Sequence, residues 1–168
     1  SPLPPETEFI KALKDFINLT ARQKKQPEMS VIEIERIKKN RYYSLLSPKT
    51  KSLIENWKSF LIKWDANKKN GKLPTINSLV AGSDSAGFME DKGYVTAVRN
   101  CLIFHESLRN GPDYNHKPII YRKLGILYDR YPEMSLWGLP ESYFQACIIL
   151  RPHSEISRNC YQDLEKRI

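Results

Sequence analysis

Apolar residues recur at spacings of three and four along almost the whole chain, and this period constrains the fold more than any other feature. The stretch from Pro48 to Ala66 shows it best, because its apolar side chains, two tryptophans among them, fall on one face of a helix. Alternation with a period of two, which is typical of half-buried strands, never extends beyond a few residues. We therefore expect an all-α fold: a single compact multi-helix domain with seven or eight helices.

Prolines and capping residues indicate where the helices begin and end. Ser47 before Pro48 is a good N-cap followed by a proline at the first helical position. Ser30 and Glu33 have the spacing of a capping box at the start of a second helix. Residues 145–150 alone have a rival interpretation, as a short buried strand. The expected helices cover about residues 6–20, 30–41, 48–66, 75–80, 93–109, 118–131, 140–151 and 154–164.

The excess of basic over acidic residues is confined to the first part of the chain. Residues 1–75 contain 16 basic and 8 acidic residues, whereas residues 76–168 contain 11 of each. The whole net charge of +8 therefore lies in the first part. A small-residue loop at 81–87, rich in Gly and Ser, separates a basic helical half, residues 1–80, from a charge-neutral half, residues 88–168. We expect the two halves to pack as one domain, with the loop flexible.

The basic residues gather at predicted loops and helix ends, from which they can project toward a phosphate backbone. We expect them to converge into one continuous cationic surface that binds nucleic acid. Tyr42 and Tyr43 beside them offer stacking surfaces. The candidate nucleic-acid-binding residues are Arg22, Lys24, Lys25, Arg36, Lys38, Lys39, Arg41, Lys68, Lys69 and Lys72.

Binding to the DNA backbone is a better expectation than readout of a base sequence. The helices predicted between Pro48 and Arg109 are compatible with a tri-helical unit like a helix-turn-helix. The last of them carries only Arg99 and Arg109 as basic residues, which is few for a recognition helix.

Two short segments resemble DNA-associated families. Residues 53–58 (Leu-Ile-Glu-Asn-Trp-Lys) resemble the Leu-x-x-x-Trp-Lys stretch of helical domains in transcription elongation factors. Residues 57–78 look like part of a fungal activator-type DNA-binding domain, but without the Trp-Arg pair of that family. Each resemblance covers well under half of the chain, so neither is taken as a family assignment.

The sequence lacks the motifs of a metal site or an enzyme. Cys101 and His105 stand one helical turn apart, but no paired Cys-x-x-Cys or His-x₃-His ligands accompany them. No nucleophile elbow or Cys–His signature is present. The odd number of cysteines, three, suits a reducing compartment, and we expect each to be a small free core residue. We therefore expect a non-enzymatic domain without metal or cofactor.

A protein–protein adaptor is the alternative function. Such a domain would bind a helical or acidic peptide of a partner, with aromatic anchors at Tyr128, Tyr131 and Trp137.

No apolar run is long enough to span a membrane, and the Pro-rich start lacks a secretory signal. We therefore expect part of a larger nuclear protein, or a cytoplasmic one, that meets nucleic acid and another protein of a nuclear complex.

Overall fold

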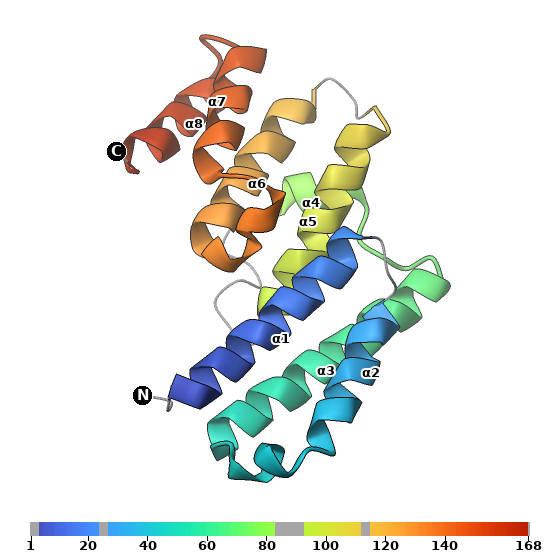
Figure 1. Ribbon diagram of the computed structural model, residues 1–168. Coiled ribbons are helices and arrows are strands. Elements are labelled where there is room, and N and C mark those ends of the chain that lie inside the picture. The colour runs from blue at the N-terminus through green and yellow to red at the C-terminus, as the bar shows by residue number, and fades with distance from the viewer. Residues whose placement is uncertain (1–3, 24–26, 83–92, 112–114, 168) are drawn as a thin grey trace. The chain divides into compact units, whose positions relative to one another are not determined.

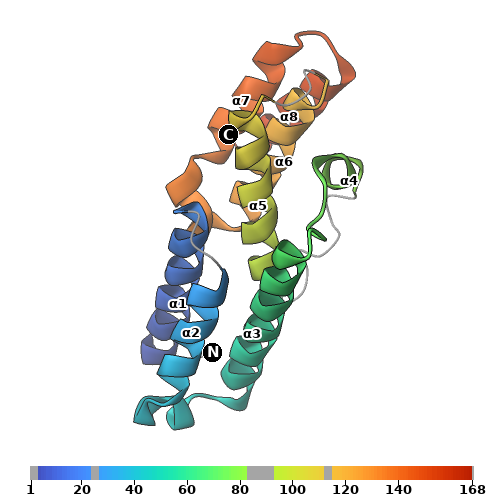
Figure 2. The same ribbon diagram turned by 90° about the vertical axis from the view of Figure 1, so that its right-hand side faces the viewer.

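The computed structural model describes residues 4–23, 27–82, 93–111 and 115–167. These residues form eight α-helices and two short 3₁₀ helices and contain no strand, which confirms the all-α prediction (Figures 1 and 2). The elements are α1 (Pro4–Arg22), α2 (Pro27–Lys38), η1 (Arg41–Leu45), α3 (Pro48–Lys69), α4 (Ile76–Ala81), α5 (Gly93–Arg109), α6 (Lys117–Arg130), η2 (Pro132–Trp137), α7 (Pro140–Leu150) and α8 (Glu155–Glu165). None of the described helices is both long and apolar enough to cross a membrane.

Side-chain caps begin three of the helices where the sequence places them. Ser47 Oγ accepts a hydrogen bond from the Thr50 amide at 3.2 Å, at the start of α3. Thr75 caps α4 in the same way and Ser154 caps α8. Each hydroxyl satisfies an amide that has no partner within its helix, so a local residue fixes the boundary.

The predicted cap of the second helix is wrong. Ser30 does not cap α2, because that helix already begins at Pro27, whose ring suits the first helical position. Ser30 is instead buried and shares a hydrogen bond of 3.0 Å with Thr20 of α1. The helix predicted over residues 140–151 is confirmed, since residues 145–150 form the second half of α7 and not the short buried strand of the rival interpretation.

The chain divides into two compact units. The first unit consists of Ser1–Leu73 with Gly87–Arg99, and the second of Pro74–Ala86 with Asn100–Ile168. This division differs from the predicted halves, residues 1–80 and 88–168, because α5 begins in the first unit and ends in the second. Of the predicted loop at 81–87, only Ala81 and Gly82 lie within the described residues.

In the first unit, α2 packs against both α1 and α3. The core of this unit contains fully buried apolar side chains from all three helices, including Ile17, Ile34 and Trp57. The ring of Trp57 lies 5.7 Å from that of Tyr94, centroid to centroid. Full burial of one such side chain contributes about 1.5–3 kcal/mol to the free energy of unfolding, so these contacts hold the three helices together.

In the second unit, α7 packs against both α6 and α8. The approach of α6 to α7 depends on Gly125, since a Cβ atom there would lie 2.6 Å from Cε1 of the buried Phe144. The absent side chain lets the Phe144 ring lie directly on the α6 backbone.

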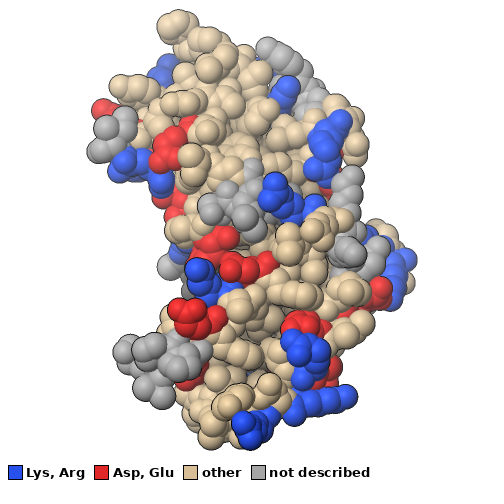
Figure 3. Space-filling view, in the orientation of Figure 1, with Lys and Arg blue, Asp and Glu red and all other residues tan. Residues whose placement is uncertain are grey.

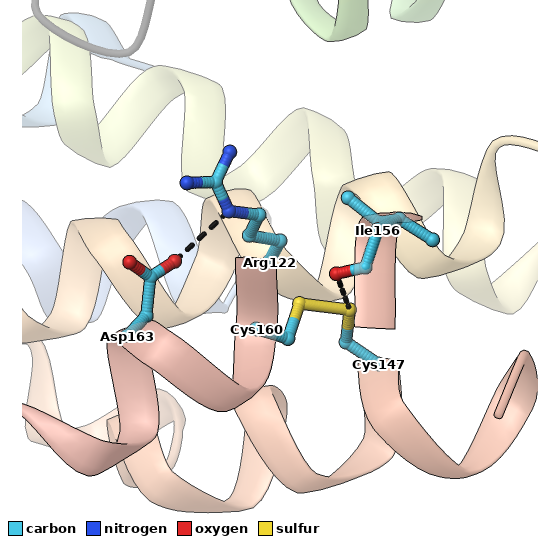
Figure 4. A network of polar contacts seen from close by, with 5 residues as sticks. All are labelled: Arg122, Cys147, Ile156, Cys160 and Asp163. Atoms are coloured by element: carbon cyan, nitrogen blue, oxygen red, sulfur yellow. Dashed lines mark hydrogen bonds and ion pairs between the residues drawn. A yellow bond between two sulfur atoms is a disulfide. The ribbon is translucent and has the colours of Figure 1, made fainter. Parts of the chain in front are cut away.

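A disulfide between Cys147 and Cys160 joins α7 to α8 (Figure 4). Arg122 of α6 also donates to Asp163 of α8 at 2.9 Å. The expectation of three free cysteines is therefore wrong for two of them, and only Cys101 is free. The two partners are 13 positions apart, and they meet because a short connection folds α8 back onto α7.

Candidate nucleic-acid interface

The strongest candidate site lies where the chain passes from α2 through η1 into α3. We refer to residues 38–51 as the cationic turn. This segment carries five Lys and Arg residues and no Asp or Glu. Figure 3 shows Lys and Arg atoms grouped at the end of the first unit where η1 lies.

Hydrogen bonds fix the backbone of the cationic turn. Asn40 Oδ1 accepts from the Tyr42 amide at 2.9 Å and so caps η1. Ser44 Oγ donates to the carbonyl of Arg41 at 2.8 Å, and Lys51 Nζ donates to the carbonyl of Ser44 at 3.0 Å. These bonds satisfy polar groups locally, so η1 has a defined shape before any ligand binds.

A buried carboxylate of α1 also holds the turn. Glu6 Oε1 accepts from the Ser47 hydroxyl at 2.7 Å and from the Ser47 amide at 3.2 Å. Hydrogen bonds from Thr50 and Ser47 keep the pKa of Glu6 below its ordinary value. The ionised carboxylate thus ties the start of α1 to the start of α3.

Two apolar side chains stand exposed on η1. Tyr42 is 59% exposed and Leu45 is 76% exposed. In a 3₁₀ helix, residues three positions apart lie on the same side, so these two side chains are neighbours. The guanidinium carbon of Arg41 lies 5.1 Å from the centroid of the Tyr42 ring, and its Nη2 donates to the Tyr42 hydroxyl at 3.2 Å. Tyr43 is half-buried, and burial raises its pKa.

The cations differ in their availability. Arg36, just before the turn, is paired with Glu33, and Lys38 is paired with Glu55. The hydrogen bond from Lys38 to Glu55 raises the pKa of this lysine. Ion pairing thus offsets the charge of two predicted site residues within their own unit.

Three cations of the turn remain available. Lys39, Arg41 and Lys49 are exposed and make no ion pair with any residue that the structure describes. Lys49 and Lys51 are not among the site residues predicted from the sequence. The absence of acidic residues from 37 to 54 is the signal that points to them.

The remaining predicted cations that the structure describes lie at the other end of α2. Lys69 is paired with Asp65 at 2.9 Å and with Glu28 at 3.5 Å, which places the end of α3 beside the start of α2. Arg22, Lys68 and Lys72 are exposed there, whereas Lys24 and Lys25 lie outside the described residues. The 12 residues of α2 separate this group from the cationic turn, a distance of about 18 Å at the rise of an α-helix. The described cations therefore form two groups and not one continuous surface.

Of the predicted partner-binding residues whose side chains are described, one is buried and the other half-buried. Tyr128 is only 2% exposed and belongs to the core of the second unit, which corrects its assignment as a surface anchor. Tyr131 is half-buried after the end of α6. Trp137 ends η2, and its side chain lies outside the described part of the structure.

The buried Tyr128 is the centre of a polar cluster in the second unit, with the buried Cys101 and the half-buried His105. Its hydroxyl shares hydrogen bonds with Cys101 Sγ at 3.0 Å and with His105 Nε2 at 2.8 Å. Its ring stacks on Tyr143, with the centroids 5.1 Å apart. Burial raises the pKa of the Cys101 thiol to about 12, so this cysteine is protonated and a poor nucleophile at neutral pH.

Metal ligands do not gather within the described residues, where no three His, Cys, Asp or Glu side chains lie close enough together to hold an ion. Comparison of the chain with family models, with curated proteins and with solved structures finds no match. The cationic turn is therefore the feature from which a function is best argued.

Proposed function

We propose that this chain is a non-enzymatic nucleic-acid-binding domain of a nuclear protein and that it holds the phosphate backbone at the cationic turn. One observation carries the proposal: an ordered turn presents Lys39, Arg41 and Lys49 without ion-pair partners among the described residues and without a carboxylate in the segment. Cations on an ordered turn can meet several phosphates with little loss of backbone freedom.

Salt dependence follows from the number of cations. Each phosphate that is neutralised on duplex DNA releases counterions and contributes about −0.9 to the slope of log affinity against log salt concentration. Three contacts give a slope of about −2.7, so affinity falls about 40-fold between 50 mM and 200 mM salt. A slope near zero would mean that the turn does not bind through phosphates.

The test compares two triple variants of the full chain that remove equal charge from opposite ends of α2. Lys39→Ala/Arg41→Ala/Lys49→Ala changes the cationic turn, and Arg22→Ala/Lys68→Ala/Lys72→Ala is the matched control. Binding to fluorescein-labelled nucleic acid, duplex and single-stranded, is measured by anisotropy at 50 mM and 200 mM salt.

We expect the first variant to lose most of the binding and the control to lose little. Equal losses in both variants would show that binding is spread over the surface and has no site at the turn. No binding by the unaltered chain at 50 mM salt would refute the proposal.

A protein–protein adaptor is the second candidate function. Leu139 and Ile149 are large apolar residues that stand exposed on the second unit. Exposed side chains of this kind can anchor an amphipathic helix of a partner. This candidate gains support if the unaltered chain binds no nucleic acid and Ile149→Asp abolishes binding to a defined partner helix.

A further inference from the structure

We infer, building on the function proposed above, that the ligand of the cationic turn is single-stranded and that one unpaired base stacks on the ring of Tyr42. Phosphate contacts alone do not require an aromatic side chain. The turn nevertheless presents a tyrosine that is 59% exposed, between Lys39 and Lys49 in the sequence.

The Tyr42 ring is presented by an ordered backbone. Its amide donates to Asn40 Oδ1, and the next amide, that of Tyr43, donates to the Asn40 carbonyl at 3.0 Å. The Leu46 amide closes the same short helix by donating to the carbonyl of Tyr43 at 3.1 Å. A ring on such a support loses little conformational freedom when a base stacks on it.

Arg41 places a planar cation beside this ring. Its guanidinium lies over the Tyr42 ring and donates to the Tyr42 hydroxyl, so the ring already has a cation on one side. A base that stacks on the exposed part of the ring brings its own phosphates close to Arg41. Leu45, which lies on the same side of η1, extends the apolar surface toward the sugar or the next base.

A duplex gains little from the exposed Tyr42 ring. Its base faces are stacked inside the helix, and exposing one costs a few kcal/mol of unstacking and unpairing. A single strand offers free base faces, and stacking on an aromatic side chain strengthens binding by about 1–3 kcal/mol per base, which is a factor of about 5–150 in affinity. The exposed tyrosine therefore favours single strands, whereas the cations serve both forms.

The experiment measures binding of the full chain to three fluorescein-labelled probes at 50 mM salt: a 12-nucleotide oligo(dT), the same strand with abasic sites, and a duplex of equal length. The abasic strand keeps the phosphates and removes the bases. Tyr42→Ala is compared with Tyr42→Phe, which keeps the ring. Tyr161→Ala is the matched control, since Tyr161 is 57% exposed but lies on the second unit.

We expect Tyr42→Ala to lower the affinity for oligo(dT) by about 5–150-fold and to leave binding to the abasic strand and the duplex unchanged. Tyr42→Phe and Tyr161→Ala retain the affinity of the unaltered chain. Far-ultraviolet circular dichroism of each variant verifies that the helices are intact.

Two results would overturn the inference while the proposed function stands. One is an unchanged affinity of Tyr42→Ala for oligo(dT) while the triple variant of the cationic turn still loses binding. The other is an equal loss on all three probes. If the unaltered chain binds no probe and associates only with vesicles of anionic phospholipid, the inference and the proposed function both fail.

Discussion

Loss of the bond between Cys147 and Cys160 is expected to destabilise the second unit strongly. The two sulfurs are buried, and their residues are 13 positions apart in the sequence. In the chain-entropy model, a crosslink that closes a loop of this length restricts the unfolded chain and contributes about 3 kcal/mol to the free energy of unfolding. Reduction should therefore shift the unfolding equilibrium about 150-fold toward the unfolded state.

Urea unfolding of the full chain, followed by circular dichroism at the helix band, measures this contribution. Three samples are compared: the oxidised chain, the chain in a phosphine reductant, and Cys147→Ala/Cys160→Ala. Cys101→Ala is the control that changes a cysteine without touching the bond. The reductant should leave the stability of the double variant unchanged, since that variant has no bond to lose.

Thiol labelling under denaturing conditions provides an independent check. One cysteine should react with maleimide before reduction and all three after it, as read from the mass of the labelled chain. Three reactive cysteines in the unreduced protein would refute the bond. An unchanged free energy of unfolding after complete reduction would refute the loop-entropy reasoning.

Other substitutions and pH changes probe the packing and the caps. Gly125→Ala forces a methyl group against Phe144 and should lower the free energy of unfolding by about 1–3 kcal/mol, measured by urea titration. Ser47→Ala removes both the cap of α3 and the hydroxyl that donates to Glu6, and it should cost about 2–4 kcal/mol in the same assay, whereas an alanine at the exposed Ser52 should cost far less. The pKa of Glu6 is lower in the folded chain than its unfolded value near 4.5. The ionised Glu6 therefore stabilises the fold above pH 4.5, and this contribution is lost as the pH falls through the folded pKa. Glu6→Gln should flatten this part of the acid-denaturation curve. Tyr128→Phe removes the hydroxyl that Cys101 and His105 bind and should cost about 1–3 kcal/mol, while an unchanged stability would argue against that cluster.

The local features of the fold are predictable from sequence because they depend on neighbouring residues. Ser47, Thr75 and Ser154 each cap an amide only three positions ahead, and the apolar period that follows identifies the helix. Ser30 shows the limit of this reasoning. Its spacing to Glu33 has the form of a cap, yet a proline three positions earlier starts the helix, and the hydroxyl bonds to Thr20 of another helix.

The tertiary features are not predictable in this way, because they depend on which helix faces come together. The spacing of Cys147 and Cys160 does not reveal that they pair. Tyr128 looks like a surface aromatic in sequence, but it fills the core of the second unit. Lys38 likewise belongs to a basic run in the sequence, and only the packing of α2 on α3 gives it Glu55 as a partner.

The close contact of Gly125 with Phe144 has a consequence for how this fold can diverge. A residue larger than glycine on that turn of α6 meets the aromatic ring at once, and the ring is buried and has little room to move. Homologues that keep this helix pairing are therefore expected to vary at the two positions together, and a bulkier residue at 125 requires a smaller one at 144. Either substitution alone leaves a clash or a cavity, so the pair should change as compensating steps.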